Sequence, residues 1–476
     1  MHLTCTLSSK SQLVFILVIL SLFIGNNSFA QNDTSQKVTY KVNDIILFGN
    51  TTTKNNIIIR ELTFKKGDLI DTNIIKKEMA QSRDNIYNTS LFNKVDVTYY
   101  PFGNHEVNVV IFLKERWYLW PVPIFEIHER NFNEWWLTKN FHRAVYGGYL
   151  IYRNFRGRNE TLQLSVREGY YQSYSLNYTI PYINKNQNTG LGFSVGYSNN
   201  YEIVYKVRND SLQYYTNDSI KPLQEYYAEA RLTKRSGLYN THTFYIDYKW
   251  DKITDSVINL NHDYFLNSNN TEQYLMLSYN FESDYRDIKI YPLKGYYYNF
   301  MIQQLGFFQK DLNITYLKAS FRKFWKLSDP FYLETGINGR LSSTYTKQPF
   351  FLQSALGYGN DFVRGYELYV INGQSYGLFK TELKWQIFRP KVFYIPFIPA
   401  EKFNSIPIAL YLTAFGDLGY VRDNLYGSGN PLTNSFLPGA GIGLDYVSYY
   451  NIVWRFEYSI NKMGERGFYL HFVAPL

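Results

Sequence analysis

Residues 452–460, with the sequence IVWRFEYSI, decide the fold class of this chain. Large apolar side chains alternate with polar or small ones, and this period of two predicts a β-strand with two different faces. The same alternation recurs in residues 244–250, 331–341 and 379–387. It is the dominant pattern from Trp117 to Leu476.

The chemistry of the two faces indicates a membrane barrel rather than a soluble sandwich. One face is aromatic and aliphatic over stretches of about 10 residues, as in strands that contact lipid. The other face carries both charge signs, for example Glu334 and Arg340, which suits a wet lumen. Soluble sandwiches also alternate, but their strands are shorter. Residues 117–476 are therefore predicted to form a transmembrane antiparallel β-barrel of about 16 strands, closed so that lipid meets no unpaired edge.

The composition agrees with a mainly β membrane protein. Tyr, Phe and Trp make up 19% of the chain, with 47 Tyr and 35 Phe. Membrane barrels use such residues at both water–lipid boundaries. No segment after residue 30 reaches about 18 unbroken apolar residues, so spanning helices are not expected. The formal net charge of +9 is scattered along the chain and does not favour a nucleic-acid partner.

Residues 1–30 are predicted to be a signal peptide. Lys10 is the only charged side chain before Gln31, an apolar run covers residues 13–24, and Ser28-Phe29-Ala30 offers small residues at a cleavage site. The apolar run is too short for a membrane-spanning helix, which needs about 20 residues, although a membrane anchor is the alternative. The sole cysteine, Cys5, lies in this segment, so neither a disulfide framework nor thiolate chemistry is expected.

Residues 38–115 are predicted to form a small α+β domain in front of the barrel. Residues 42–48 resemble a strand, Thr51 to Thr53 are placed to cap a helix that ends at Leu62, and Thr72 is placed to cap a second helix. Residues 91–99 and 106–113 then alternate as a hairpin. The predicted order is strand, helix, helix, strand, strand.

No chemical constellation accompanies these patterns. The His residues are scattered without metal-ligand spacing, and neither a Gly-x-Ser-x-Gly elbow nor a phosphate-binding glycine loop occurs. Residues 439–443 are Gly-rich, but they alternate like a strand whose small residues face a crowded lumen. No enzyme activity, cofactor or metal is expected.

Several segments resemble the BamA/TamA (bacterial surface antigen) superfamily of outer-membrane assembly and secretion barrels. The signature of that family is similar to Val363, Arg364, Gly365 and Tyr366, which lie in a long late loop. Further similar segments, in the order of the family, are 154–158, 178–182, 284–287, 291–295 and 415–419. The front domain resembles a POTRA module, and the chain has room for only one, unlike the main bacterial assembly factor. Residues 465–472 also fit the terminal insertion signal of client barrels, with four residues after it.

The resemblance implies a protein that helps other β-barrels to insert and fold in the outer membrane of a Gram-negative bacterium, with the POTRA-like domain in the periplasm. The implied partners are unfolded outer-membrane proteins, outer-membrane lipid and periplasmic or lipoprotein accessory subunits. A polypeptide-secretion pore of the same superfamily and a passive outer-membrane channel are the alternatives. Insertion is favoured over secretion because secretion relatives usually carry two POTRA domains.

Two sites are expected from these segments. In the family the signature loop folds into the lumen, so Arg364 is expected to pair with Asp417, which shares an inward face with Tyr411 and Thr413 and precedes Gly419. The second site is a weak lateral seam between the first and last strands. Proline has no N–H, so Pro121 and Pro123 remove two donors from one edge of the first strand. The last strand carries Gly467, Phe468, Leu470 and Phe472, followed by Pro475.

Overall fold

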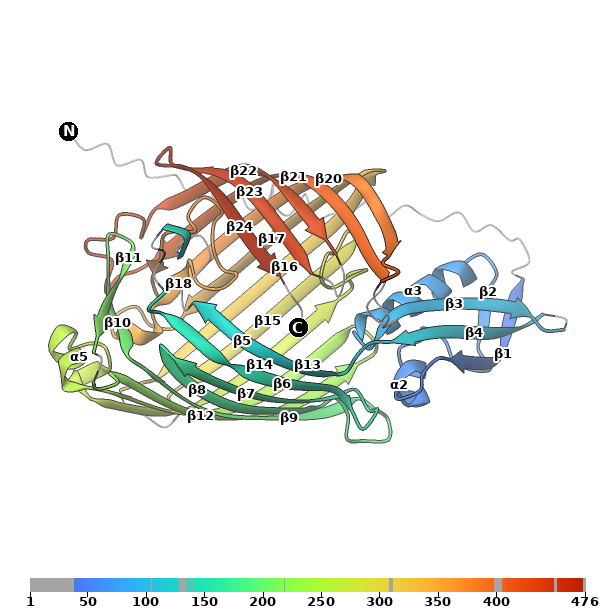
Figure 1. Cartoon of the computed structure of the whole chain (residues 1–476), viewed down its shortest axis with the longest axis horizontal. Helices are drawn as coiled ribbons and strands as arrows, with labels where there is room; N and C mark the ends of the chain where they lie inside the picture. Colours follow the sequence, from blue (N-terminus) through green and yellow to red (C-terminus); the bar gives the residue numbers. More distant parts are fainter. Residues whose placement is uncertain are drawn as a thin grey trace, which may run out of the picture.

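The computed structural model describes residues 38–103, 105–127, 135–137, 139, 141–217, 219–307, 311–397, 405–448 and 452–473. The predicted signal peptide and Pro475 lie outside the described residues. Within them the chain forms a small α+β domain beside a large curved sheet (Figure 1). No helix in these ranges is both long and apolar enough to cross a membrane.

The front domain is a four-stranded sheet with two helices. Its elements are β1 (Thr39–Phe48), α2 (Asn55–Ile59), β2 (Leu69–Asp71), α3 (Ile75–Asn88), β3 (Phe92–Pro101) and β4 (Glu106–Glu115). The strand order is β2-β1-β4-β3, with β1 and β4 parallel. Ile75, Met79 and Ile86 of α3 are buried in the core with Val107 and Ile111 of β4. This packing uses the apolar helix face expected from the sequence, and β3 forms a long edge of the sheet.

Three details of the front domain differ from the sequence-based expectation. The first helix begins after Lys54 and ends at Ile59 because the hydroxyls of Thr51 and Thr53 bind the Glu115 carboxylate, at 2.9 and 2.6 Å, instead of capping the helix. The second helix begins at Ile75, with Ile74 rather than Thr72 at its N-cap. The additional strand, β2, pairs with the start of β1.

The predicted barrel of 16 strands is confirmed. Its strands are β5 (Leu119–Ile127), β6 (Ala144–Phe155), β7 (Glu160–Gly169), β8 (Tyr171–Ile180), β9 (Thr189–Asn200), β12 (Leu223–Ser236), β13 (Asn240–Ile253), β14 (Thr271–Asp284), β15 (Gly295–Leu305), β16 (Ile314–Ser328), β17 (Phe331–Ser342), β20 (Ser375–Tyr394), β21 (Ser405–Arg422), β22 (Phe436–Val447), β23 (Val453–Asn461) and β24 (Arg466–Val473). They form one 16-stranded sheet in sequence order, each antiparallel to its neighbours.

The two faces of the barrel wall match the alternation. On the outer face, Ile337 and Trp385 are 58% and 44% exposed. On the inner face, Lys384 and Glu457 are each 1% exposed. Apolar side chains therefore face outward and charged side chains fill the lumen, as expected of a wall between lipid and water.

Packed segments cover both mouths of the barrel. At the mouth far from the front domain, the hairpin of β10 (Glu202–Arg208) and β11 (Ser211–Thr216) lies near α5 (Asp255–Leu260), as Figure 1 shows. An apolar cluster joins these segments to the loop that carries η2 (Phe350–Leu352). At the near mouth, Tyr291 is buried, and its hydroxyl donates to Asp445 Oδ2 at 2.8 Å.

The front domain docks on the near-side turns of the barrel. Arg235, at the end of β12, donates two hydrogen bonds of 2.6 Å to the Glu61 carboxylate. Asn154, after β6, donates to Thr53 Oγ1 at 2.8 Å. Gly157 follows with φ +69°, and a Cβ there would lie 2.2 Å from the Thr52 carbonyl oxygen, so only glycine fits this close approach.

Candidate functional site

The long loop between β17 and β20 forms the centre of the candidate site. It carries the short pair β18 (Ser354–Leu356) and β19 (Ile371–Asn372) and packs inside the barrel. Val363 and Tyr366 are each 1% exposed, in an apolar cluster with Leu356, Leu378 and Leu437. Burial of these side chains fixes the tip of the loop against the lumen side of β20 to β22.

Arg364 lies in the lumen against Asp417, as the sequence analysis expected. Its Nε and Nη2 donate to the two Asp417 oxygens at 2.9 and 2.7 Å, and its backbone N–H adds a third bond of 3.1 Å. Nη1 also contacts Glu382 and, at 3.5 Å, Glu457. The guanidinium lies over the Phe415 ring, 3.8 Å from its centroid. Because an arginine stays charged at any physiological pH, this one cation holds carboxylates from β20, β21 and β23.

Glycines make room for this loop. Gly365 has φ +94°, a conformation that favours glycine. A Cβ on Gly439 would lie 1.9 Å from the Arg364 carbonyl oxygen, and one on Gly419 would lie 2.5 Å from Val363 Cγ2. The strand of small residues at 439–443 therefore faces a crowded lumen, and Gly419 acts by leaving space.

Tyr366 joins the loop to the far turns of the last strands. Its hydroxyl donates to the Pro438 carbonyl at 3.1 Å and accepts from the Lys462 N–H at 3.1 Å. Asn461 Nδ2 donates to the Gly365 carbonyl at 3.0 Å. The four signature residues are thus all held by β21 to β23 and the turn that follows.

The seam between the first and last strands is the second part of the site. Within the described residues, β5 pairs with β6 and β24 pairs with β23, but β5 and β24 share no backbone ladder. Figure 1 draws them as the two edges of the sheet, with strands of the opposite wall visible between them.

The prolines lie within β5, opposite Leu150 and Gly148 of β6, rather than in the linker before the strand. The Arg153 N–H donates to the Tyr118 carbonyl, so even-numbered residues of β5 point their backbone groups to β6. Pro121 and Pro123 therefore lack their donors on the open side. In β24, Phe468 and Phe472 are exposed, and Gly467 and Leu470 pair with Ser459 and Phe456.

The comparisons with known proteins agree with this architecture. A family profile described as Omp85 superfamily domain matches residues 154–469, about two thirds of the chain. The chain belongs to the Omp85 superfamily. A second profile, for the POTRA domain and described as surface antigen variable number repeat, matches residues 40–116.

Solved Omp85-like barrels share the fold. BamA from Haemophilus ducreyi lacking POTRA domains 1–3 aligns with a TM-score of 0.51 and 16% identity, over 99% of this chain and 94% of that one. CdiB from Escherichia coli aligns with a TM-score of 0.51 and 13% identity, over 91% and 75%. Comparison with curated protein sequences gives no match.

Sequence reasoning about this Omp85 chain missed part of the lumen site. Glu457 and His471 lie on inward positions of β23 and β24, and Glu367 follows the signature in the loop. Strand parity pointed to Glu382 and Glu457 as polar lumen residues, but nothing in the spacing shows that they share Arg364. Lys384 also lies there, 2.9 Å from Glu334 and 3.4 Å from Glu382.

Proposed function

We propose that this Omp85 protein lies in the outer membrane of a Gram-negative bacterium, with its POTRA domain in the periplasm, and assists the insertion and folding of other β-barrel proteins. Its partners are unfolded outer-membrane proteins and the surrounding lipid, with periplasmic or lipoprotein subunits as accessories. The observation that carries the proposal is the unpaired seam between β5 and β24.

The physical reason is the cost of an unpaired strand in lipid. A client strand that enters a bilayer needs partners for its backbone groups, and an open sheet edge supplies them. The edge of β24 offers backbone groups along eight residues, whereas the facing edge of β5 lacks the donors of Pro121 and Pro123. A client strand therefore competes against a seam that β5 closes poorly.

A passive channel is less well supported because both mouths are covered. The far mouth carries an apolar cluster that includes Val257, Phe265 and Phe350, and Tyr291 is buried at the near mouth. Between them, the signature loop occupies part of the lumen. A secretion pore of the same superfamily remains the second candidate, and it predicts passage through the lumen rather than release at the seam.

The POTRA domain offers a place for an extended client. A groove of about 350 Å³ runs between α3 and the edge strand β3, lined by Lys76, Met79, Ala80, Arg83, Val97, Thr98 and Tyr99. The Phe102 N–H donates to the Glu106 carbonyl, so the N–H groups of Val97 and Tyr99 point away from β4. Exposed edges with such donors bind peptides through the main chain.

The deciding experiment is client folding in liposomes. The purified protein is reconstituted, and a urea-unfolded barrel is added while its folding is followed by gel migration. Faster folding than in empty liposomes supports the proposal, and ion conductance without faster folding supports a channel. Transport of a client into the liposome without membrane insertion supports secretion.

The role of the seam is tested with a disulfide between β5 and β24, chosen by screening cysteine pairs for cross-linking. Oxidation should abolish the acceleration and reduction should restore it. The control pair is Leu317→Cys with Leu341→Cys, which are register partners on the outer face of β16 and β17. Equal activity of the seam-locked and control-locked proteins contradicts a lateral gate.

The groove is tested by Ala80→Trp, which fills it, against Lys77→Trp on an exposed position of the same helix. Client folding should slow with the first change and not with the second. Deletion of residues 38–115 should also slow client folding. Full activity after both changes would show that the domain is only a spacer.

A further inference from the structure

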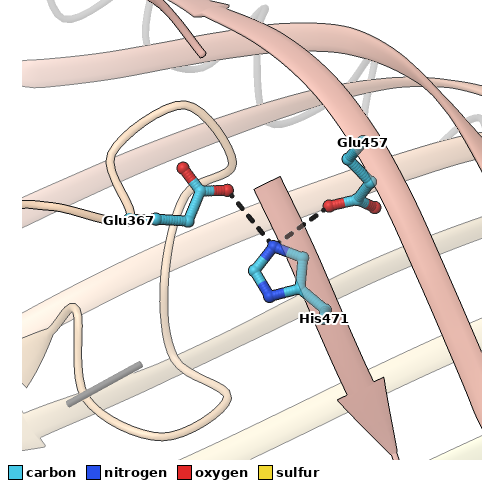
Figure 2. Close-up of side chains that lie close together, drawn as sticks. All are labelled: Glu367, Glu457 and His471. Carbon is cyan, nitrogen blue, oxygen red and sulfur yellow. Dashed lines mark ion pairs between the residues drawn. The ribbon is translucent and has the colours of Figure 1, made fainter. Parts of the chain in front are cut away.

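A cluster of side chains from three elements meets where the signature loop touches the last two strands. Figure 2 shows Glu367 of the loop and Glu457 of β23 pointing at the imidazole of His471 in β24. Glu367 Oε1 and Glu457 Oε2 lie 3.4 and 3.2 Å from His471 Nε2. Their ligand atoms all lie within 4.8 Å of one another.

We propose that this cluster binds a divalent transition-metal ion, with Zn²⁺ as the best fit. Zinc is bound by neutral histidine nitrogen and carboxylate oxygen at about 2.0–2.2 Å, so adjacent ligand atoms of a tetrahedron lie about 3.3–3.5 Å apart. The two contacts of Nε2 match that edge length. Calcium and magnesium prefer oxygen ligands alone, whereas imidazole favours zinc and its neighbours.

The alternative, a protonated histidine bridging two carboxylates, fits the geometry less well. Both carboxylate oxygens are directed at the same nitrogen, which carries at most one hydrogen. In the described part of the chain, His471 Nε2 makes no contact with the geometry of a hydrogen bond. A metal ion has no such restriction, because one ion accepts several donors around it.

Neighbouring groups already orient the ligands. Glu367 Oε2 accepts the Gly365 N–H at 2.8 Å, and Glu457 Oε1 accepts from Arg364 at 3.5 Å. The Phe362 ring stacks on the imidazole, with centroids 5.0 Å apart. Such outer contacts fix metal ligands in position. Arg364 competes weakly for Glu457, because its shorter bonds go to Asp417 and Glu382.

The exposure of the ligands provides an entry path. The side chains of both glutamates are 2% exposed, whereas that of His471 is 19% exposed. An ion can therefore arrive from the side of His471 and keep a water molecule as its fourth ligand. Once bound, it would join the signature loop to β23 and to β24, whose other edge borders the seam.

The test is zinc binding by the untagged full-length protein in detergent, stripped with a chelator and titrated against a chromogenic zinc competitor. We expect one tight site per chain and the strong visible absorption of four-coordinate Co²⁺ when cobalt replaces zinc. His471→Ala and Glu457→Gln should weaken zinc binding at least 100-fold. His262→Ala, on an exposed loop, is the matched control and should bind like the wild type.

Gel migration and circular dichroism establish that each variant is folded. Zinc should also raise the unfolding midpoint of the wild type but not that of His471→Ala, because a ligand stabilises only a state that binds it. Absence of a saturable site in the wild type, or unchanged binding by both folded variants, overturns the proposal. No client is present in these measurements, so their outcome is independent of the insertion assay.

Discussion

Replacement of Arg364 by alanine is the most direct test of the lumen network. In the described part of the chain, every hydrogen bond to the Asp417 carboxylate comes from Arg364, and the side chain of Asp417 is 0% exposed. Arg364→Ala removes both side-chain bonds and leaves the backbone bond alone. Glu382 keeps Lys384 at 3.4 Å, and Glu457 keeps His471 at 3.2 Å. One buried carboxylate is thus left largely uncompensated.

The expected loss follows from that count. Removing one partner of a buried ion pair costs about 3–5 kcal/mol, and the remaining partners of Glu382 and Glu457 favour the lower end. The contact of the guanidinium with Phe415 adds about 1 kcal/mol. We therefore expect Arg364→Ala to lower the free energy of unfolding by about 4 kcal/mol. Arg364→Lys keeps the charge but not the two parallel bonds, so its loss should be smaller.

The assay is urea unfolding in lipid vesicles, followed by tryptophan fluorescence and gel migration. Arg466→Ala, an exposed position in β24, is the control and should change stability by less than about 0.5 kcal/mol. The double variant Arg364→Ala, Asp417→Asn should be more stable than the sum of the single losses predicts, because it removes the stranded charge. A stability of Arg364→Ala equal to that of the control would refute the reasoning.

Three further predictions concern the loop, the hinge and the plug. Gly439→Ala should cost about 2 kcal/mol by pushing on the Arg364 carbonyl, whereas Gly377→Ala, which meets nothing within 4 Å, should be nearly neutral in the same unfolding assay. Burial alone would raise the pKa of Glu115, but hydrogen bonds from residues 51–53 hold it below its usual value. Its stabilisation is therefore fully present above the unfolded pKa of about 4.3 and is lost as pH falls through the folded pKa, so the thermal midpoint of the wild type should fall more steeply below pH 4.3 than that of Glu115→Gln. Tyr291→Ala should raise ion conductance in planar bilayers, while Tyr291→Phe, which keeps the ring, should not.

The barrel was predictable because its information is local. Alternation along residues 331–341 or 452–460 states which side chains face out, and parity along β21 places Asp417 on the inner face without any long-range knowledge. The strand number followed from the same repeat. The unpaired donors of Pro121 and Pro123 are also a local property, since residues two apart in a strand share a side.

What the sequence did not reveal depends on contacts between distant segments. Thr51 and Thr53 have the chemistry of helix caps, but Glu115, more than 60 residues away, takes their hydroxyls. Glu367 and His471 converge across 104 positions, so metal-ligand spacing could not show them. Likewise, no local signal pairs Glu61 with Arg235, although that pair anchors the front domain.

The charges of the lumen are better explained by position than by stability. An apolar filling of similar shape is often at least as stable as buried ion pairs, so the network around Arg364 is a poor means of holding the barrel together. It does impose one arrangement, because the guanidinium reaches Asp417, Glu382 and Glu457 only when the loop tip lies at one height in the lumen. An apolar loop tip has no such requirement, since hydrophobic contacts are not directional. We infer that the buried charges fix the register of the loop against β20, β21 and β23, and that this fixed loop in turn holds the strands next to the seam.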